Sequence, residues 1–133
     1  MLHHILVVDD DKEVREGILL QLGDTRYTIL EAEDGEMAIE CLNNHALTVD
    51  AIICDVRMPK INGVEAVAYF RREFPGTPVI VLTGFPDVDL AVEFMKAGVV
   101  DFLVKPVEKA KLIETVERAA SQRTLFGVPE KLA

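Results

Sequence analysis

The chain has 133 residues, half of them apolar, which suits one compact domain with a single buried core. Asp and Glu outnumber Lys and Arg by 23 to 14, and the net charge of −9 would repel a phosphate backbone, so direct nucleic-acid binding is not expected. No apolar run approaches the roughly 18 to 20 residues that cross a bilayer, and the first residues lack the basic and long apolar regions of a signal peptide. We therefore expect a cytoplasmic protein that contacts no membrane.

Short apolar runs rich in β-branched residues predict strands, because they are too brief for helices. In chain order these runs are Ile5–Val8, Tyr27–Leu30, Ala51–Cys54, Val79–Leu82 and Val99–Val104. The second run is the weakest, and Asp101 interrupts the fifth.

Apolar residues in the segments after these runs recur at spacings of three and four, as on one face of an amphipathic helix. In chain order the sets are Val14, Ile18 and Leu22; Ala38, Cys41 and Leu42; Val64, Val67 and Ala68; Val88, Ala91, Val92 and Met95; and Leu112, Ile113, Val116 and Ala119. Turn residues such as Gly98 fall near the expected helix ends. A repeated strand-then-helix order with apolar strands predicts a doubly wound α/β domain, whose parallel sheet is covered on both faces.

We expect one domain over residues 1–120 and a tail or linker stub over 121–133, which contains Gly127 and Pro129 and shows no periodicity. Cys41 and Cys54 have no metal-ligand spacing and are predicted to be small buried apolar residues. The three histidines are not expected to be ligands either, since no further ligand stands at a useful spacing.

Polar residues follow the predicted strands, and the carboxyl ends of parallel strands meet at one edge of a sheet. These residues are Asp9, Asp10, Asp11, Asp55, Thr83 and Lys105, of which Asp11 is typical of a helix N-cap. Two carboxylates about 4 Å apart repel by roughly 4 kcal/mol at an effective dielectric near 20, so a cation must offset the group. Lys105 supplies one charge, and a hard divalent cation such as Mg²⁺ would supply the rest. A carboxylate facing a metal, a lysine and a hydroxyl is equipped to attack phosphorus.

The segments ILVVDDD, CDVRMPKINGVEA, VIVLTG and DFLVKP resemble, in order and spacing, the motifs of response-regulator receiver domains over residues 4 to about 120. The resemblance implies a flavodoxin-like (βα)5 fold with a five-stranded parallel sheet of order 2-1-3-4-5. It also implies a signalling module of two-component systems rather than an enzyme, with Mg²⁺ or Mn²⁺ as cofactor.

By position, the resemblance makes Asp55 the phosphoacceptor, Asp10 the direct metal ligand and Asp9 its water-mediated helper. Arg57 stands where relatives offer a main-chain carbonyl to the metal. Lys105 is the cation that pairs with the phosphoryl group, and its bond to Pro106 is cis in relatives.

The resemblance further implies a switch, in which the Thr83 hydroxyl turns towards the phosphoryl group and Phe102, at the switch aromatic position, fills the vacated space. A core phenylalanine is the alternative reading of Phe102. The face made by the fourth helix, fifth strand and fifth helix would then change shape and contact an effector domain or a second copy. The expected partner is a sensor histidine kinase or phosphotransfer domain, docking on the first helix and the loop after Lys105, near Ile18 or Val107.

Three other classes of protein share parts of this pattern. An aspartate-nucleophile phosphatase needs a second Asp where Arg57 stands, and a flavodoxin-like cofactor binder needs a phosphate-cradling loop where Asp9 and Asp10 stand. A pseudo-receiver, which binds a partner without phosphorylation, stays open.

The resemblance places Arg57 and Phe85 beside the path by which water would reach the phosphoryl group. Because neither side chain is a general base, we expect slow self-dephosphorylation.

Overall fold

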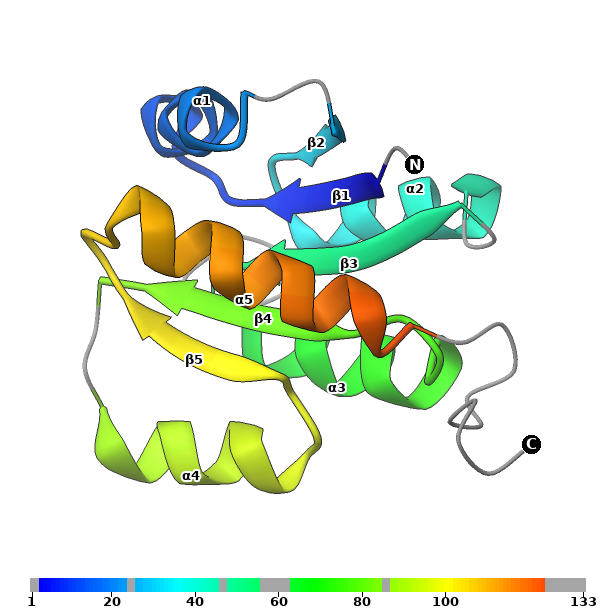
Figure 1. The fold of residues 1–133 in the computed structure, drawn as a ribbon. Coiled ribbons are helices and arrows are strands. Elements are labelled where there is room, and N and C mark those ends of the chain that lie inside the picture. The colour runs from blue at the N-terminus through cyan, green and yellow to red at the C-terminus, as the bar shows by residue number, and fades with distance from the viewer. Residues whose placement is uncertain (1–2, 24–25, 46–47, 56–62, 85–86, 124–133) are drawn as a thin grey trace.

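The computed structural model describes residues 3–23, 26–45, 48–55, 63–84 and 87–123, in which strands and helices alternate along the chain (Figure 1). The strands are β1 (His3–Val8), β2 (Tyr27–Ala32), β3 (Val49–Cys54), β4 (Val79–Thr83) and β5 (Asp101–Val104). The helices are α1 (Lys12–Gln21), α2 (Gly35–His45), α3 (Gly63–Glu73), α4 (Val88–Lys96) and α5 (Lys109–Ser121). Across these described ranges, none of the helices combines the length and the apolar character needed to cross a bilayer.

All strand pairs are parallel, and the sheet order is β2-β1-β3-β4-β5, which confirms the predicted topology. Val8 at the end of β1 lies opposite Ala32 on one side and Cys54 on the other. Thr83 at the end of β4 lies opposite Val104 at the end of β5. The ends of β1, β2 and β3 are therefore level, whereas Cys54 lies opposite Val81 and β4 continues to Thr83. The residues that follow the strands gather at this edge of the sheet, which we call the carboxyl edge.

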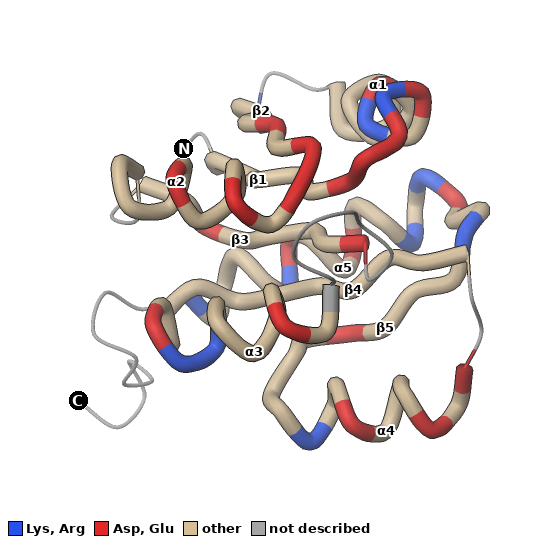
Figure 2. Tube along the Cα trace, turned by 180° about the vertical axis from the view of Figure 1, so that it is seen from behind, with Lys and Arg blue, Asp and Glu red and all other residues tan. Residues whose placement is uncertain are grey.

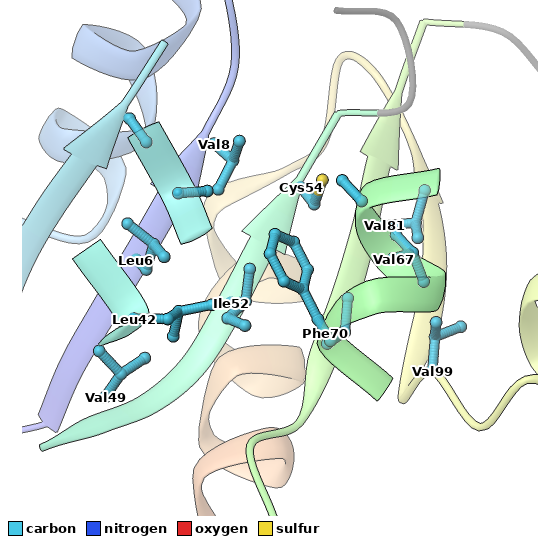
Figure 3. Close-up of a cluster of buried hydrophobic side chains, with 14 of the residues drawn as sticks. Leu6, Val8, Leu42, Val49, Ile52, Cys54, Val67, Phe70, Val81 and Val99 are labelled. Atoms are coloured by element: carbon cyan, nitrogen blue, oxygen red, sulfur yellow. The ribbon is translucent and has the colours of Figure 1, made fainter. Parts of the chain in front are cut away.

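The continuous apolar character of the strands reflects a core on each face of the sheet. Successive side chains of a strand point to opposite faces, so Ile5 and Val7 enter one core while Leu6 and Val8 enter the other. The first core is closed by α1 and α5, and the second by α2, α3 and α4. Figure 3 shows the second core, where the Phe70 ring of α3 points towards Ile52 and Cys54 of β3.

The helix faces were predicted unevenly. In α5 the predicted stripe is correct, because Leu112, Val116 and Ala119 are buried against the sheet. In α4 the prediction is wrong: Val88, Val92 and Met95 are 75%, 47% and 48% exposed, and Leu90 and Phe94 pack on the core instead. Apolar spacing alone cannot tell a core stripe from an exposed one when both occur on a single short helix.

The fifth strand also begins later than predicted, at Asp101 rather than Val99. Gly98 has a φ of 94°, and the N–H of Val99 donates to the carbonyl of Phe94 at 3.2 Å, so both residues close the C-terminus of α4. The glycine signal was read correctly as a helix end, but the apolar residues after it belong to the turn.

Candidate functional site

The carboxyl edge brings together three acids that are far apart in the sequence. Main-chain hydrogen bonds extend the sheet by one residue beyond β1 and β3: Asp9 N–H donates to Ala32 at 3.0 Å, and Asp55 N–H donates to Val8 at 2.9 Å. Carboxylate oxygens of Asp9, Asp10 and Asp55 consequently lie within 4.8 Å of one another. Figure 2 shows acidic residues gathered on the segments where β1 and β2 run into α1 and α2.

Lys105 bridges two of these acids from the end of β5. Its Nζ donates to Asp9 Oδ2 at 2.8 Å and to Asp55 Oδ2 at 3.3 Å. The Lys105 N–H donates to the Thr83 carbonyl at 2.8 Å, and the Lys105–Pro106 bond is cis, as the resemblance implied. Burial lowers the pKa of the ammonium, but the hydrogen bond to Asp9 and the charges of both acids outweigh it, so the pKa lies above the ordinary 10.5. The lysine is therefore charged at neutral pH.

Asp9 and Asp10 are adjacent but differ in their surroundings. Asp9 is buried, and both of its carboxylate oxygens are engaged, Oδ1 by the Asp11 N–H at 2.9 Å and Oδ2 by Lys105. Asp10 is exposed, and its carboxylate has no hydrogen bond or ion pair with any residue that the structure describes. Asp10 thus has free oxygens to offer a ligand, whereas Asp9 is committed to holding the turn and the lysine.

The donor set fits a hard divalent cation. Among the described residues, three carboxylates gather here and Lys105 pairs with two of them, and all the donor atoms are oxygen, as Mg²⁺ and Mn²⁺ prefer. Over the described ranges, no other group of three His, Cys, Asp or Glu side chains could hold a metal. Cys54 is buried below Asp55, and burial raises the pKa of its thiol, which keeps it neutral, while Cys41 is half-buried.

Thr83 and Phe102 lie on the neighbouring strands β4 and β5. Thr83 is fully buried at the end of β4. Phe102 is half-buried and stacks on Phe94 of α4, with ring centroids 6.1 Å apart and an interplanar angle of 26°. Phe102 therefore joins β5 to α4 and packs against the second core from its edge. Arg57 and Phe85 lie outside the described residues.

The first helix confirms one expectation and narrows another, the docking contact near Ile18. Asp11 is the N-cap of α1, as predicted, since its carboxylate accepts from the Glu13 N–H at 2.9 Å. Ile18, however, is 4% exposed and belongs to the core, while Leu20 is 81% exposed. Sequence reasoning also missed Arg15, whose side chain turns back to the end of β1. Arg15 stands among the polar positions of the predicted helix, as an ordinary surface arginine does. The sequence therefore carries no signal for this contact.

This fold and this edge define a class of signalling module. The model of the response regulator receiver domain matches residues 5–117, and the chain belongs to that family. It is thus a receiver domain of two-component signal transduction, as the resemblance implied.

The relatives agree with this membership. The chain is 34% identical over 130 residues to the transcriptional regulatory protein FixJ of Bradyrhizobium diazoefficiens, covering 98% of this chain but only 62% of FixJ. A receiver domain protein from Clostridium thermocellum superposes with a TM-score of 0.84 at 29% identity, covering 90% of this chain and 94% of that one. CheY of Borrelia burgdorferi, solved as a CheX-CheY-BeF3-Mg complex, gives a TM-score of 0.82 at 25% identity, covering 87% of each chain.

Proposed function

We propose that Asp55 accepts a phosphoryl group from a histidine kinase or phosphotransfer protein, in a reaction that needs Mg²⁺ or Mn²⁺. One observation carries the proposal: Asp55 is a buried carboxylate that lies within 4.8 Å of the carboxylates of Asp9 and Asp10, and its Oδ2 is 3.3 Å from Lys105 Nζ. Carboxylates this close to one another repel, and a divalent metal would offset the repulsion. The Borrelia relative, whose complex contains BeF3 and Mg, supports the same chemistry for this chain.

The metal would be held by the carboxylates of Asp10 and Asp55, and Asp9 would contact it through a water molecule. The family pattern adds the main-chain carbonyl of Arg57. When bound, the cation supplies positive charge to the oxygens of the incoming phosphoryl group. Asp9 contributes differently, because its oxygens already hold Lys105 and the Asp11 N–H. It keeps the ammonium over Asp55 and sets the direction of the turn that carries Asp10.

In the transfer, an Asp55 carboxylate oxygen attacks phosphorus and forms the new O–P bond. With phosphohistidine as donor, the N–P bond breaks, and the imidazole nitrogen keeps the electron pair and takes up a proton. Lys105 already reaches both Asp9 and Asp55, so it can keep its bond to Asp9 while pairing with a phosphoryl oxygen. The Thr83 hydroxyl, at the end of the next strand, would donate a hydrogen bond to the same group.

Phosphorylation would change the surface formed by α4, β5 and α5. Phe102 joins β5 to α4 by its stack on Phe94, so a movement of Thr83 that draws Phe102 inward would loosen this stack. The surface of this region exposes apolar residues that no described segment covers, namely Val88, Val92, Met95 and Val104. An effector domain or a second copy of the chain would contact this surface. The chain spans 62% of FixJ, so the remainder of that relative lies outside the match.

The kinase or phosphotransfer helix would dock on α1 and on the loop after Lys105. Ile18 is buried and cannot take part, so we assign the apolar contact on α1 to Leu20, with Val107 half-buried on the loop. Gln21 joins the two elements, because its Nε2 donates to the Val107 carbonyl at 2.9 Å. Leu20→Glu should slow transfer from a phosphorylated partner but leave transfer from a small phosphodonor unchanged.

The central test is incubation with acetyl phosphate and Mg²⁺, followed by intact mass measurement. We expect one added phosphoryl group, dependent on the metal and absent in Asp55→Asn. Asp50→Asn is the matched control, since Asp50 lies at the opposite end of β3 and should leave the modification intact. An unmodified parent protein would instead favour a phosphorylation-independent pseudo-receiver, and modification of Asp55→Asn would place the acceptor elsewhere.

The lifetime of the phosphorylated state is expected to be long, because Arg57 and Phe85 are large and neither can act as a general base. In Arg57→Asn/Phe85→Glu the phosphorylated protein should decay faster than in the parent. Equal or slower decay would show that these side chains do not shield the phosphoryl group.

A further inference from the structure

Arg15 of α1 is held far more tightly than a surface arginine. Its side chain is 12% exposed, whereas that of Lys12 on the same helix is 78% exposed. The Arg15 Nη1 donates to the main-chain carbonyl of Asp9 at 2.6 Å, and its Nε donates to Glu31 Oε1 on β2 at 3.1 Å. The guanidinium thus ties the start of α1 to the ends of both β1 and β2.

The contact with Asp9 acts on the candidate metal site through the backbone. The Asp9 carbonyl belongs to the planar peptide unit that joins Asp9 to Asp10, so fixing this oxygen fixes the direction in which Asp10 leaves the strand. The other anchors of Asp9 lie on its N–H and its carboxylate, where Ala32, Asp11 and Lys105 bind. Arg15 is the described side chain that holds the peptide itself.

We propose that Arg15 is a positioning residue for the divalent-cation site: it orients the Asp10 carboxylate towards the metal, and Glu31 is its counter-charge. The inference rests on the proposed function. A bare guanidinium near the site would repel a divalent cation, but the Arg15–Glu31 pair is neutral in sum. Arginine suits the task because its planar fork presents Nε and Nη1 to two acceptors at once, whereas lysine has a single nitrogen.

Positioning and simple charge effects predict opposite signs, which makes the proposal testable. If Arg15 were only a nearby cation, Arg15→Gln would bind Mg²⁺ more tightly and Arg15→Lys would bind it as the parent does. If Arg15 positions Asp10, both variants should bind Mg²⁺ more weakly, by about tenfold, as is typical for loss of a group that orients a metal ligand. Lys12→Gln is the matched control, because it removes the same charge from the same helix without a contact to Asp9.

The experiment is a Mg²⁺ titration of the parent and the three variants by isothermal calorimetry, since the chain has no Trp to report binding by fluorescence. Thermal melting without metal, run on the same samples, separates a change in the site from a loss of fold. We expect weaker binding in Arg15→Gln and Arg15→Lys, which should melt somewhat below the parent but stay folded at the titration temperature, and unchanged or tighter binding in Lys12→Gln.

If the parent binds Mg²⁺ and Arg15→Gln binds it equally well or more tightly, the positioning role of Arg15 is overturned. The proposed function would be unaffected by that result. Weak binding in Arg15→Gln accompanied by an equal weakening in Lys12→Gln would also overturn the positioning role, because the effect would not depend on the contact with Asp9. A parent that binds no Mg²⁺ would contradict the proposed function itself, and this inference with it.

Discussion

The acids at the two ends of the central strands differ in the number of donors and cations around them. At the amino end, Asp50 of β3 accepts the His4 N–H at 2.9 Å, and its other neighbours are Arg123 at 3.7 Å and His3 at 3.8 Å. This single acid is surrounded by donors. At the carboxyl edge, three acids lie together, and Lys105 pairs with two of them, Asp9 and Asp55.

The difference separates an acid that stabilises the fold from acids that are kept for function. Asp50 joins β1, β3 and the end of α5, since Arg123 also donates to the Val49 carbonyl at 3.1 Å. Its charge is balanced within the chain. The exposed Asp10 at the carboxyl edge has no such partners among the described residues, so removing it should cost function rather than stability.

The largest expected effect is on metal binding at the carboxyl edge. Asp10→Ala should weaken Mg²⁺ binding by more than about tenfold, since loss of an outer partner of a metal ligand already costs that much. Without metal, the variant should be as stable as the parent or slightly more stable, because it relieves carboxylate crowding and opens no cavity. Calorimetric titration and thermal melting of the same sample measure both quantities. A clear loss of stability would make Asp10 a structural residue.

The opposite pattern is expected at the amino end. Asp50→Ala should lower the free energy of unfolding by about 2 kcal/mol, because the partly buried His4 N–H loses its acceptor. Mg²⁺ affinity and phosphoryl uptake should stay at the level of the parent. Urea denaturation gives the stability, and intact mass gives the uptake. If Asp50→Ala impaired uptake as strongly as Asp10→Ala, the division between the two ends would be wrong.

A smaller, pH-dependent effect tests Lys105. Its pKa is raised in the folded state, so its contribution to stability is complete below the ordinary value of 10.5 and is lost as pH rises through the higher folded value. Lys105→Met should therefore melt below the parent at neutral pH, and the gap should narrow above pH 10.5. Melting curves of both proteins across this range provide the measurement. A gap that stays constant would mean that the lysine acts through packing rather than through its charge.

The sequence by itself determined most of this protein: the alternation of elements, the parallel sheet and the gathering of Asp9, Asp10, Asp55 and Lys105 at one edge. These features follow from local patterns. A short apolar run predicts a strand, an apolar spacing of three and four predicts a helix, and each pattern is complete within a few residues. The sheet order came from the family resemblance and is confirmed.

Tertiary structure decided what depends on distant partners. The α4 stripe was predicted to be buried, yet Phe94 and Leu90 took the core side, because burial depends on which face meets the sheet. Likewise, Asp9 and Asp10 are the same residue type side by side, and they differ in part because Lys105, just after β5, and Arg15, on α1, contact Asp9. A hydrogen bond between groups far apart along the chain leaves no periodic trace in the sequence, so it appears only when the chain is folded.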